Sequence, residues 1–253
     1  QCEHKSVHCV LASKETFMSA FKIIDIPNVN QTKSDLSFKG GIPNIPVRFA
    51  LPNCKFCNSE MTFFFQVSFP EGHVWEGKVM ALFQCTSYHQ GSNDWPKFVL
   101  AEDHLVLPDN GLDTYQTNFR IFVFNANEPV SERLEAKRVL KFERIEFEKT
   151  PSATKTKKVG GTPNWSKNRW DGKSPTELYK RVTYMGGGVI FLMQTENNWL
   201  FTRLPDALPQ FQHYKEDQPR YNYYSLFYGP YLYFSGTTSP QLEPPRVLVY
   251  ALG

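Results

Sequence analysis

The chain has 253 residues, a length typical of one large domain or two small ones. Its 28 lysines and arginines stand against 25 aspartates and glutamates, and a net charge of +3 is far below the excess of basic tails that bind nucleic acids. Aromatic residues make up 15% of the chain, which excludes a disordered protein, because disordered chains are poor in aromatics.

The first 37 residues have no strand-like pattern, and we interpret residues 1–37 as an N-terminal extension with a short amphipathic segment around Ser13–Ile24. The start of the chain lacks the basic, apolar and small-residue regions of a signal peptide. No apolar run approaches the ~18 residues of a membrane span. We therefore expect a soluble, cytoplasmic protein with no membrane partner.

Most of the remaining sequence is typical of β-strands. Runs rich in Phe and β-branched residues are bounded by turn signals such as Pro70-Glu71-Gly72. Helix candidates are few: Ser131–Leu140, and a segment that opens with a capping box at Ser174–Glu177. The sequence predicts a mainly β (α+β) fold with few short helices. The expected strands are Met61–Phe69, Lys78–Ser87, Arg120–Asn125, Val139–Phe147, Val189–Gln194, Tyr231–Ser235 and Arg246–Leu252.

Two Gly-Gly-x-Pro-Asn segments, at residues 40–44 and 160–164, divide the chain into similar halves. Each is followed by an apolar strand with a glutamine, Gln66 or Gln194, and then by a second strand. The same order on both sides of a polar segment indicates an internal duplication. We expect two related β-rich lobes, residues 38–149 and 160–253, joined by a linker or loop at residues 150–159.

The lysines of the segment Lys149–Val159 have two interpretations. They could contact nucleic acid, or they could simply keep a surface loop in solvent. The low net charge of the chain favours the solvated loop, so we expect nucleic-acid binding to be unlikely.

The spacing of short motifs resembles the YwqG-like family and the related N-terminal part of the programmed cell death protein 2 family. The shared order is Gly-Gly-x-Pro, then Pro-x-Cys-x-x-Cys-x-x-x-Met, then an apolar strand with Gln, then Phe-x-Cys. The resemblance covers residues 38–90 and 158–237, and departs in the insert Gln90–Val159 and at the N-terminus. It implies a duplicated β-rich fold and no established catalytic activity. The matching residues are Gly40, Gly41, Pro43, Pro52, Cys54, Cys57, Met61, Gln66, Phe83 and Cys85.

Three cysteines form a candidate metal site. Cys54 and Cys57 have the two-residue spacer that lets two thiolates hold one metal ion, and the hairpin of the two following strands would return Cys85 to them. The pattern suits a structural zinc ion, with His89 as the first choice for the fourth ligand. Cys2, His8 and Cys9 are alternative fourth ligands. The other interpretations are ordinary thiols, a disulfide, or a redox Cys-x-x-Cys, which would need a helix where a Phe-rich strand follows.

Aromatic residues near the C-terminus form a candidate binding surface. The segment Tyr214–Tyr233 is rich in tyrosine, and tyrosine and arginine are enriched at protein interfaces. Packing across strands is the alternative, with the hydroxyl groups reaching water. The predicted partner-binding residues are Arg220, Tyr221, Tyr223, Tyr224 and Tyr228.

The sequence has no recognisable catalytic signature, because G-x-S-x-G and H-E-x-x-H are both absent. We therefore expect a non-catalytic protein-binding module, with no catalytic residues. Since some bacterial YwqG-like proteins look like antitoxins, the resemblance implies an immunity protein that blocks a partner protein such as a toxin. The alternatives are a nascent-protein chaperone, similar to the programmed cell death protein 2 family, and an enzyme whose site is assembled from scattered residues such as Asp94, His104 and Arg169.

Overall fold

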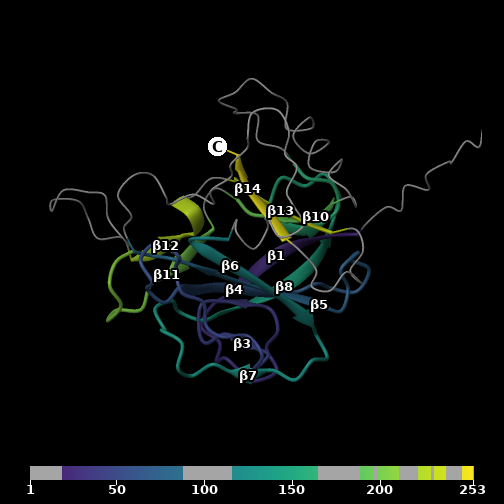
Figure 1. Ribbon diagram of the computed structural model, residues 1–253. Helices are drawn as coiled ribbons and strands as arrows, with labels where there is room; N and C mark the ends of the chain where they lie inside the picture. Colours follow the sequence, from purple (N-terminus) through teal and green to yellow (C-terminus); the bar gives the residue numbers. More distant parts are fainter. Residues whose placement is uncertain are drawn as a thin grey trace, which may run out of the picture.

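The computed structural model describes residues 19–87, 116–164, 189–196, 199–210, 222–228, 231–237 and 247–252, and nearly all regular structure in these ranges is β-strand. The predicted mainly β fold is therefore confirmed (Figure 1). No helix in the described part of the chain is long and apolar enough to cross a lipid bilayer. The strands are β1 Ala20–Ile26, β2 Phe38–Lys39, β3 Asn44–Ile45, β4 Thr62–Ser68, β5 Lys78–Gln84, β6 Phe119–Asn125, β7 Ser131–Glu132, β8 Glu143–Thr150, β9 Lys158–Gly160, β10 Val189–Gln194, β11 Leu200–Thr202, β12 Tyr223–Ser225, β13 Tyr231–Thr237 and β14 Val247–Leu252, with one 3₁₀ turn, η1, at Leu226–Tyr228.

Ten of these strands form one antiparallel sheet, in the order β14-β13-β10-β9-β1-β8-β2-β4-β5-β6. Strands β1 and β8 lie at its centre, where Ala20 pairs with Thr150 and Ile26 with Arg144 (Figure 1). Two smaller sheets, β3-β7 and β11-β12, flank it. Residues 20–24 of the segment that we expected to be amphipathic, Ser13–Ile24, thus belong to a strand in the middle of the sheet, whereas residues 13–18 lie outside the described chain.

The helix predicted for Ser131–Leu140 is wrong. Its first two residues form β7, which pairs with β3, and the backbone N–H of Arg133 donates a hydrogen bond to the carbonyl of Pro43. Pairing with a distant strand therefore overrides the local helical preference. The predicted helix at Ser174–Glu177 lies outside the described residues.

The sheet has two halves, with strands drawn from β1 to β6 and from β8 to β14. The first strand of each half lies between two strands of the other half. Strand β1 pairs with β8 and with β9, whereas β8 pairs with β1 and with β2. From one edge inwards the order is β6, β5, β4, β2 and β8, and from the other edge it is β14, β13, β10, β9 and β1. The two orders are the same when strands in the same place are matched, so that β1 corresponds to β8, β2 to β9, β4 to β10, β5 to β13 and β6 to β14. The two halves are therefore interlocked through the centre of one sheet.

This correspondence extends to irregular details. A bulge interrupts the β4–β5 ladder between Phe63 and Phe65, and the β10–β13 ladder has a bulge between Phe191 and Met193. One residue later in each strand, the amide nitrogen of Gln66 donates to the carbonyl of residue 36 at 3.3 Å, and that of Gln194 to the carbonyl of residue 156 at 3.2 Å. The glutamine that both halves share in sequence thus makes the same bond in both.

The Gly-Gly pairs at the ends of β2 and β9 are also equivalent. Gly40, Gly41, Gly160 and Gly161 all have φ between +61° and +74°, the left-handed region that glycine tolerates best. A Cβ on Gly40 would clash with the carbonyl oxygen of Lys141, just before β8, and a Cβ on Gly160 would clash with that of Ser19, just before β1. The Gly-Gly turn is therefore required where the two halves cross.

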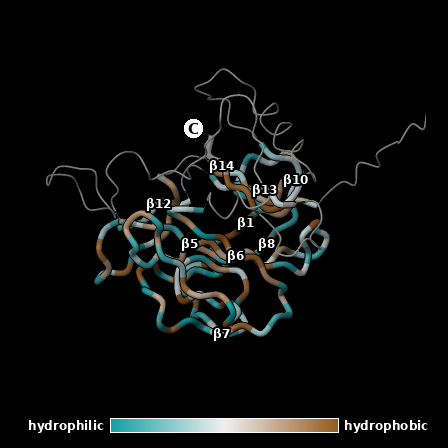
Figure 2. Tube along the Cα trace, in the orientation of Figure 1, coloured by the Kyte–Doolittle hydropathy of each residue, from teal (hydrophilic) through white to brown (hydrophobic). Residues whose placement is uncertain are grey.

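Apolar residues are buried on both faces of the first half of the sheet. Figure 2 shows the hydropathy of the residues along its strands. Along β5, Met80 and Leu82 belong to a core that extends into the second half, whereas Val79, Ala81 and Phe83 belong to a second core. Burial on both faces explains why β5 is a continuous apolar run rather than an alternating one. The second core also contains two of the cysteines of the candidate site.

A group of charged side chains is buried between the halves. The carboxylate of Asp25 on β1 forms ion pairs with Lys39 of the first half, at 3.0 Å, and with Lys157 of the second. The indole N–H of Trp199 donates to the same carboxylate at 3.3 Å, and Lys39 also pairs with Glu143 at 3.2 Å. Burial raises the pKa of Asp25, but the two lysines outweigh it and hold that pKa below its usual value.

Candidate metal centre

The hairpin of β4 and β5 brings the three predicted metal ligands together. Thr62 at the start of β4 pairs with Gln84 at the end of β5, so the chain that leaves β5 lies beside the loop that enters β4. The sulfur atoms of Cys54, Cys57 and Cys85 all lie within 4.8 Å of one another. The predicted convergence of these three cysteines is confirmed.

The sulfur geometry suits a tetrahedral metal ion. The Sγ atoms of Cys57 and Cys85 are 3.7 Å apart, and a Zn–S bond of ~2.3 Å at the tetrahedral angle would separate two sulfurs by about 3.8 Å. None of the three cysteines forms a disulfide. Cys54 and Cys85 are buried in the second core, whereas Cys57 is exposed. The site therefore lies where the second core meets solvent.

The loop at residues 53–60 is folded around the sulfur of Cys54. Asn53 and Glu60 form an isolated β-bridge, and the N–H of Asn58 donates to the carbonyl of Cys54 at 2.8 Å. The backbone N–H groups of Phe56 and Cys57 point to the Cys54 sulfur and hydrogen-bond to it. Such N–H···S bonds stabilise a thiolate, the form of cysteine that binds metal.

Two of the thiols differ in acidity. The hydrogen bond from Cys85 and those from the backbone lower the pKa of Cys54 to about 5, in spite of its burial. The same hydrogen bond, together with burial, raises the pKa of Cys85. Cys54 is thus the more acidic of the two thiols, and a metal ion would displace the protons that the pair still holds.

Asn58 is a site residue that the cysteine spacing did not reveal. Its φ is +57°, and this left-handed residue directly after Cys57 turns the chain back towards β4. The signal was present in the sequence, because asparagine tolerates the left-handed region better than other non-glycine residues do.

The predicted fourth ligand lies outside the described residues. His89 lies two residues after the described range 19–87. The alternative ligands Cys2, His8 and Cys9 lie before that range. Among the residues that the structure describes, the donor set is therefore three soft sulfur ligands. Such a set fits zinc well, because thiolates are among its preferred ligands.

The predicted partner-binding residues are described only in part. Tyr223 on β12 is half-buried, and the exposed fraction of Tyr224 is 2%. The Tyr224 hydroxyl donates to the carbonyl of Leu208 at 2.5 Å, its ring lies near Phe64, and burial raises its pKa. As folded, Tyr224 offers a partner little surface. Arg220, Tyr221 and the side chain of Tyr228 lie outside the described residues, as do Asp94, His104 and Arg169.

Comparison with known proteins adds no further assignment. No known protein family and no curated protein matches this chain.

Proposed function

We propose that this chain is a non-catalytic, cytoplasmic protein-binding module whose first half is stabilised by one structural zinc ion. The observation that carries the proposal is the cluster of Cys54, Cys57 and Cys85 in the wall of the second core. Zinc sites rich in cysteine are characteristically closed and structural, whereas catalytic zinc sites keep a position open for water. With His89 as fourth ligand, the set would be closed.

The ion pairs of Asp25 also support a structural rather than a catalytic role for the ionisable groups between the two halves. The Asp25 carboxylate already has Lys39, Lys157 and Trp199 as partners, so it is committed to joining the two halves. A general acid or base needs access to substrate. This use of the buried ionisable groups favours a role in binding over a role in catalysis.

The equivalent halves support the family relationship that the short motifs imply. We propose that the interlocked sheet arose by duplication, as the resemblance to the YwqG-like and programmed cell death protein 2 families implies. The shared bulge, the shared glutamine bond and the shared Gly-Gly turn are the supporting observations. Within this group of proteins, an immunity role against a partner toxin is our first candidate.

Metal analysis tests the zinc part. Protein purified under reducing conditions should contain about one equivalent of zinc, and its melting temperature should fall when the zinc is chelated. Cys54→Ser and Cys85→Ser should remove most of the zinc, and His89→Ala should weaken its binding. Less than about a tenth of an equivalent, with no change in melting temperature on chelation, would exclude a structural zinc ion.

Purification of the tagged protein from its own cells tests the binding part. An immunity protein should retain one stoichiometric partner that arrests growth when expressed alone and is harmless when co-expressed with this chain. A chaperone should instead retain a nascent ribosomal protein together with translating ribosomes. If the chain retains no stoichiometric protein in either setting, the proposed binding function is wrong.

A further inference from the structure

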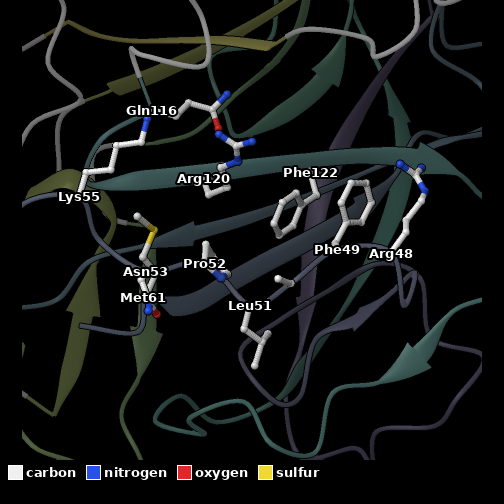
Figure 3. A pocket seen from close by; sticks show the side chains of 11 residues that line it. Arg48, Phe49, Leu51, Pro52, Asn53, Lys55, Met61, Gln116, Arg120 and Phe122 are labelled. Atoms are coloured by element: carbon white, nitrogen blue, oxygen red, sulfur yellow. The ribbon is translucent and has the colours of Figure 1, made fainter. Parts of the chain in front are cut away.

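A cavity of about 380 Å³ opens beside the metal centre, between β6 and the segment Arg48–Asn53 (Figure 3). Lys55, which lies between two of the cysteines, lines it together with Arg120 and Phe122 of β6. None of the eleven described residues that line it is acidic, whereas three are cationic. Because Glu128 pairs with Arg48, the net positive charge of the lining lies at the Lys55 and Arg120 end, beside an apolar floor.

The cations and the rings of this cavity are ordered in a row. The guanidinium carbon of Arg48 lies 4.1 Å from the ring centre of Phe49, and Phe49 is stacked on Phe122 with ring centres 4.4 Å apart. The guanidinium carbon of Arg120 lies 5.9 Å from the Phe122 ring centre. In Figure 3, Lys55 and Arg120 are at one end of the cavity, Arg48 is at the other, and the rings lie between.

Neighbouring bonds hold this row in place. Arg48 forms two hydrogen bonds with the carboxylate of Glu128, at 2.6 and 2.9 Å. The side-chain oxygen of Gln116 accepts from the N–H of Ile121 on β6 at 2.7 Å. Because these groups are already oriented, a ligand would lose little free energy in ordering them.

The covered ring faces argue against a nucleic-acid ligand. Phe49 lies between Arg48 and Phe122, while Phe122 has Arg120 near its face and meets Phe83 edge to face at 5.6 Å. Single-stranded nucleic acids are held by bases stacked on open aromatic faces. Phe122 is only 8% exposed and Phe49 is half-buried, so Phe49 is the ring of this pair that an apolar side chain of a peptide could contact.

We propose that this cavity binds an acidic segment of a partner protein, with a carboxylate at the Lys55 and Arg120 end and one apolar side chain against the half-buried Phe49. The proposal rests on the proposed protein-binding function and names the site and the chemistry of its partner. Arginine pairs well with carboxylates, and interfaces concentrate their free energy at such arginine and apolar anchors.

Binding of synthetic peptides to the full chain tests the site. The probe is a fluorescent peptide with a central phenylalanine flanked by glutamates, measured by anisotropy at low and moderate salt. We expect it to bind, to weaken as salt rises, and to lose affinity when glutamines replace the glutamates. Arg120→Glu should weaken binding about tenfold or more, whereas Lys155→Glu, the same sign of change on the exposed β8–β9 loop, should leave it unchanged.

Other outcomes overturn the proposal. An oligothymidylate that binds more tightly than the acidic peptide would assign the cavity to nucleic acid. Equal losses of peptide affinity in the Arg120→Glu and Lys155→Glu variants would show that the peptide responds to the overall charge of the protein and not to this cavity. If Arg120→Glu does not fold, Arg120→Gln removes the charge at similar size and should still weaken binding severalfold. A native partner that binds Arg120→Glu and the unchanged chain equally well would refute the cavity while leaving the proposed protein-binding function intact.

Discussion

Asn58 shows how a single backbone angle supports the metal centre. Its φ of +57° is costly for a β-branched residue and easy for glycine. We expect Asn58→Gly to retain zinc and stability, and Asn58→Val to lose about 1–2 kcal/mol of unfolding free energy and bind zinc more weakly. Zinc titration and urea denaturation of both variants check this. Equal behaviour of the two variants would show that the turn does not depend on that angle.

His73 adds a pH dependence to stability. The N–H of Trp75 donates to its Nδ1 at 2.9 Å, so Nε2 carries the proton and bonds to the carbonyl of Leu192 at 3.2 Å. Burial lowers the pKa of His73 to about 4, although the bond to Leu192 opposes this. The unfolded chain, with an ordinary histidine pKa near 6.5, therefore binds this proton more readily than the folded chain does.

Stability should consequently fall as the pH drops from about 6.5 towards 4, by about 2–3 kcal/mol from this residue. His73→Gln has no titratable group in this range, so its unfolding free energy should change less between pH 7 and pH 5 than that of the unchanged chain. Urea denaturation at both pH values measures the difference. Parallel curves for the two proteins would mean that His73 does not titrate differently on unfolding.

At the scale of elements, the Gly-Gly turns make a matched set of variants possible. Gly40→Ala and Gly160→Ala would each place a methyl group against a backbone carbonyl, whereas Gly77 has a similar φ of +77° with nothing within 4 Å of its Cβ position. We expect Gly77→Ala to cost about 1–2 kcal/mol for the backbone angle alone, and the other two to cost clearly more. Thermal melts rank the three. A comparable loss in all three variants would remove the argument that these turns are sterically required.

The sequence predicted those strands whose own residues carry a clear β-strand pattern. Runs such as Met61–Phe69 and Lys78–Ser87 are rich in Phe and Val and buried on both faces, and they match β4 and β5 closely. The two-residue strands β2, β3 and β7 were not foreseen, because their pairing depends on distant segments. The wrong helix at Ser131–Leu140 has the same cause.

The candidate site was predictable to a similar extent. Spacing and hairpin geometry brought Cys54, Cys57 and Cys85 together correctly, since a hairpin is a local structure. The cavity beside them was not predictable. It joins Arg48 and Arg120 from segments that are far apart in sequence and adjacent only in the folded sheet.

At the scale of the whole molecule, Asp25 couples the two halves. Asp25→Asn would remove the carboxylate that Lys39 and Lys157 share, leaving Lys39 with Glu143 and taking from Lys157 its ion-pair partner. Removing one partner of a buried ion pair costs about 3–5 kcal/mol. We expect a loss of about 3 kcal/mol in unfolding free energy, with one cooperative transition still joining both halves. Asp206→Asn, the same change at an exposed position, should stay within about 0.5 kcal/mol of the unchanged chain. Equal losses in both would mean that the network contributes nothing to joining the halves.

The exchange of first strands dictates when the protein can fold during synthesis. Ala20 of β1 pairs with Thr150 on one side and with Gly160 on the other, so both neighbours of β1 leave the ribosome long after it does. A nascent chain that ends before β8 therefore holds β1 with two unpaired edges, and open strand edges promote aggregation. Closing so long a loop also slows folding, since non-local contacts form only after its entropy is lost. The first half of this protein is made first but must wait for the second to complete its sheet.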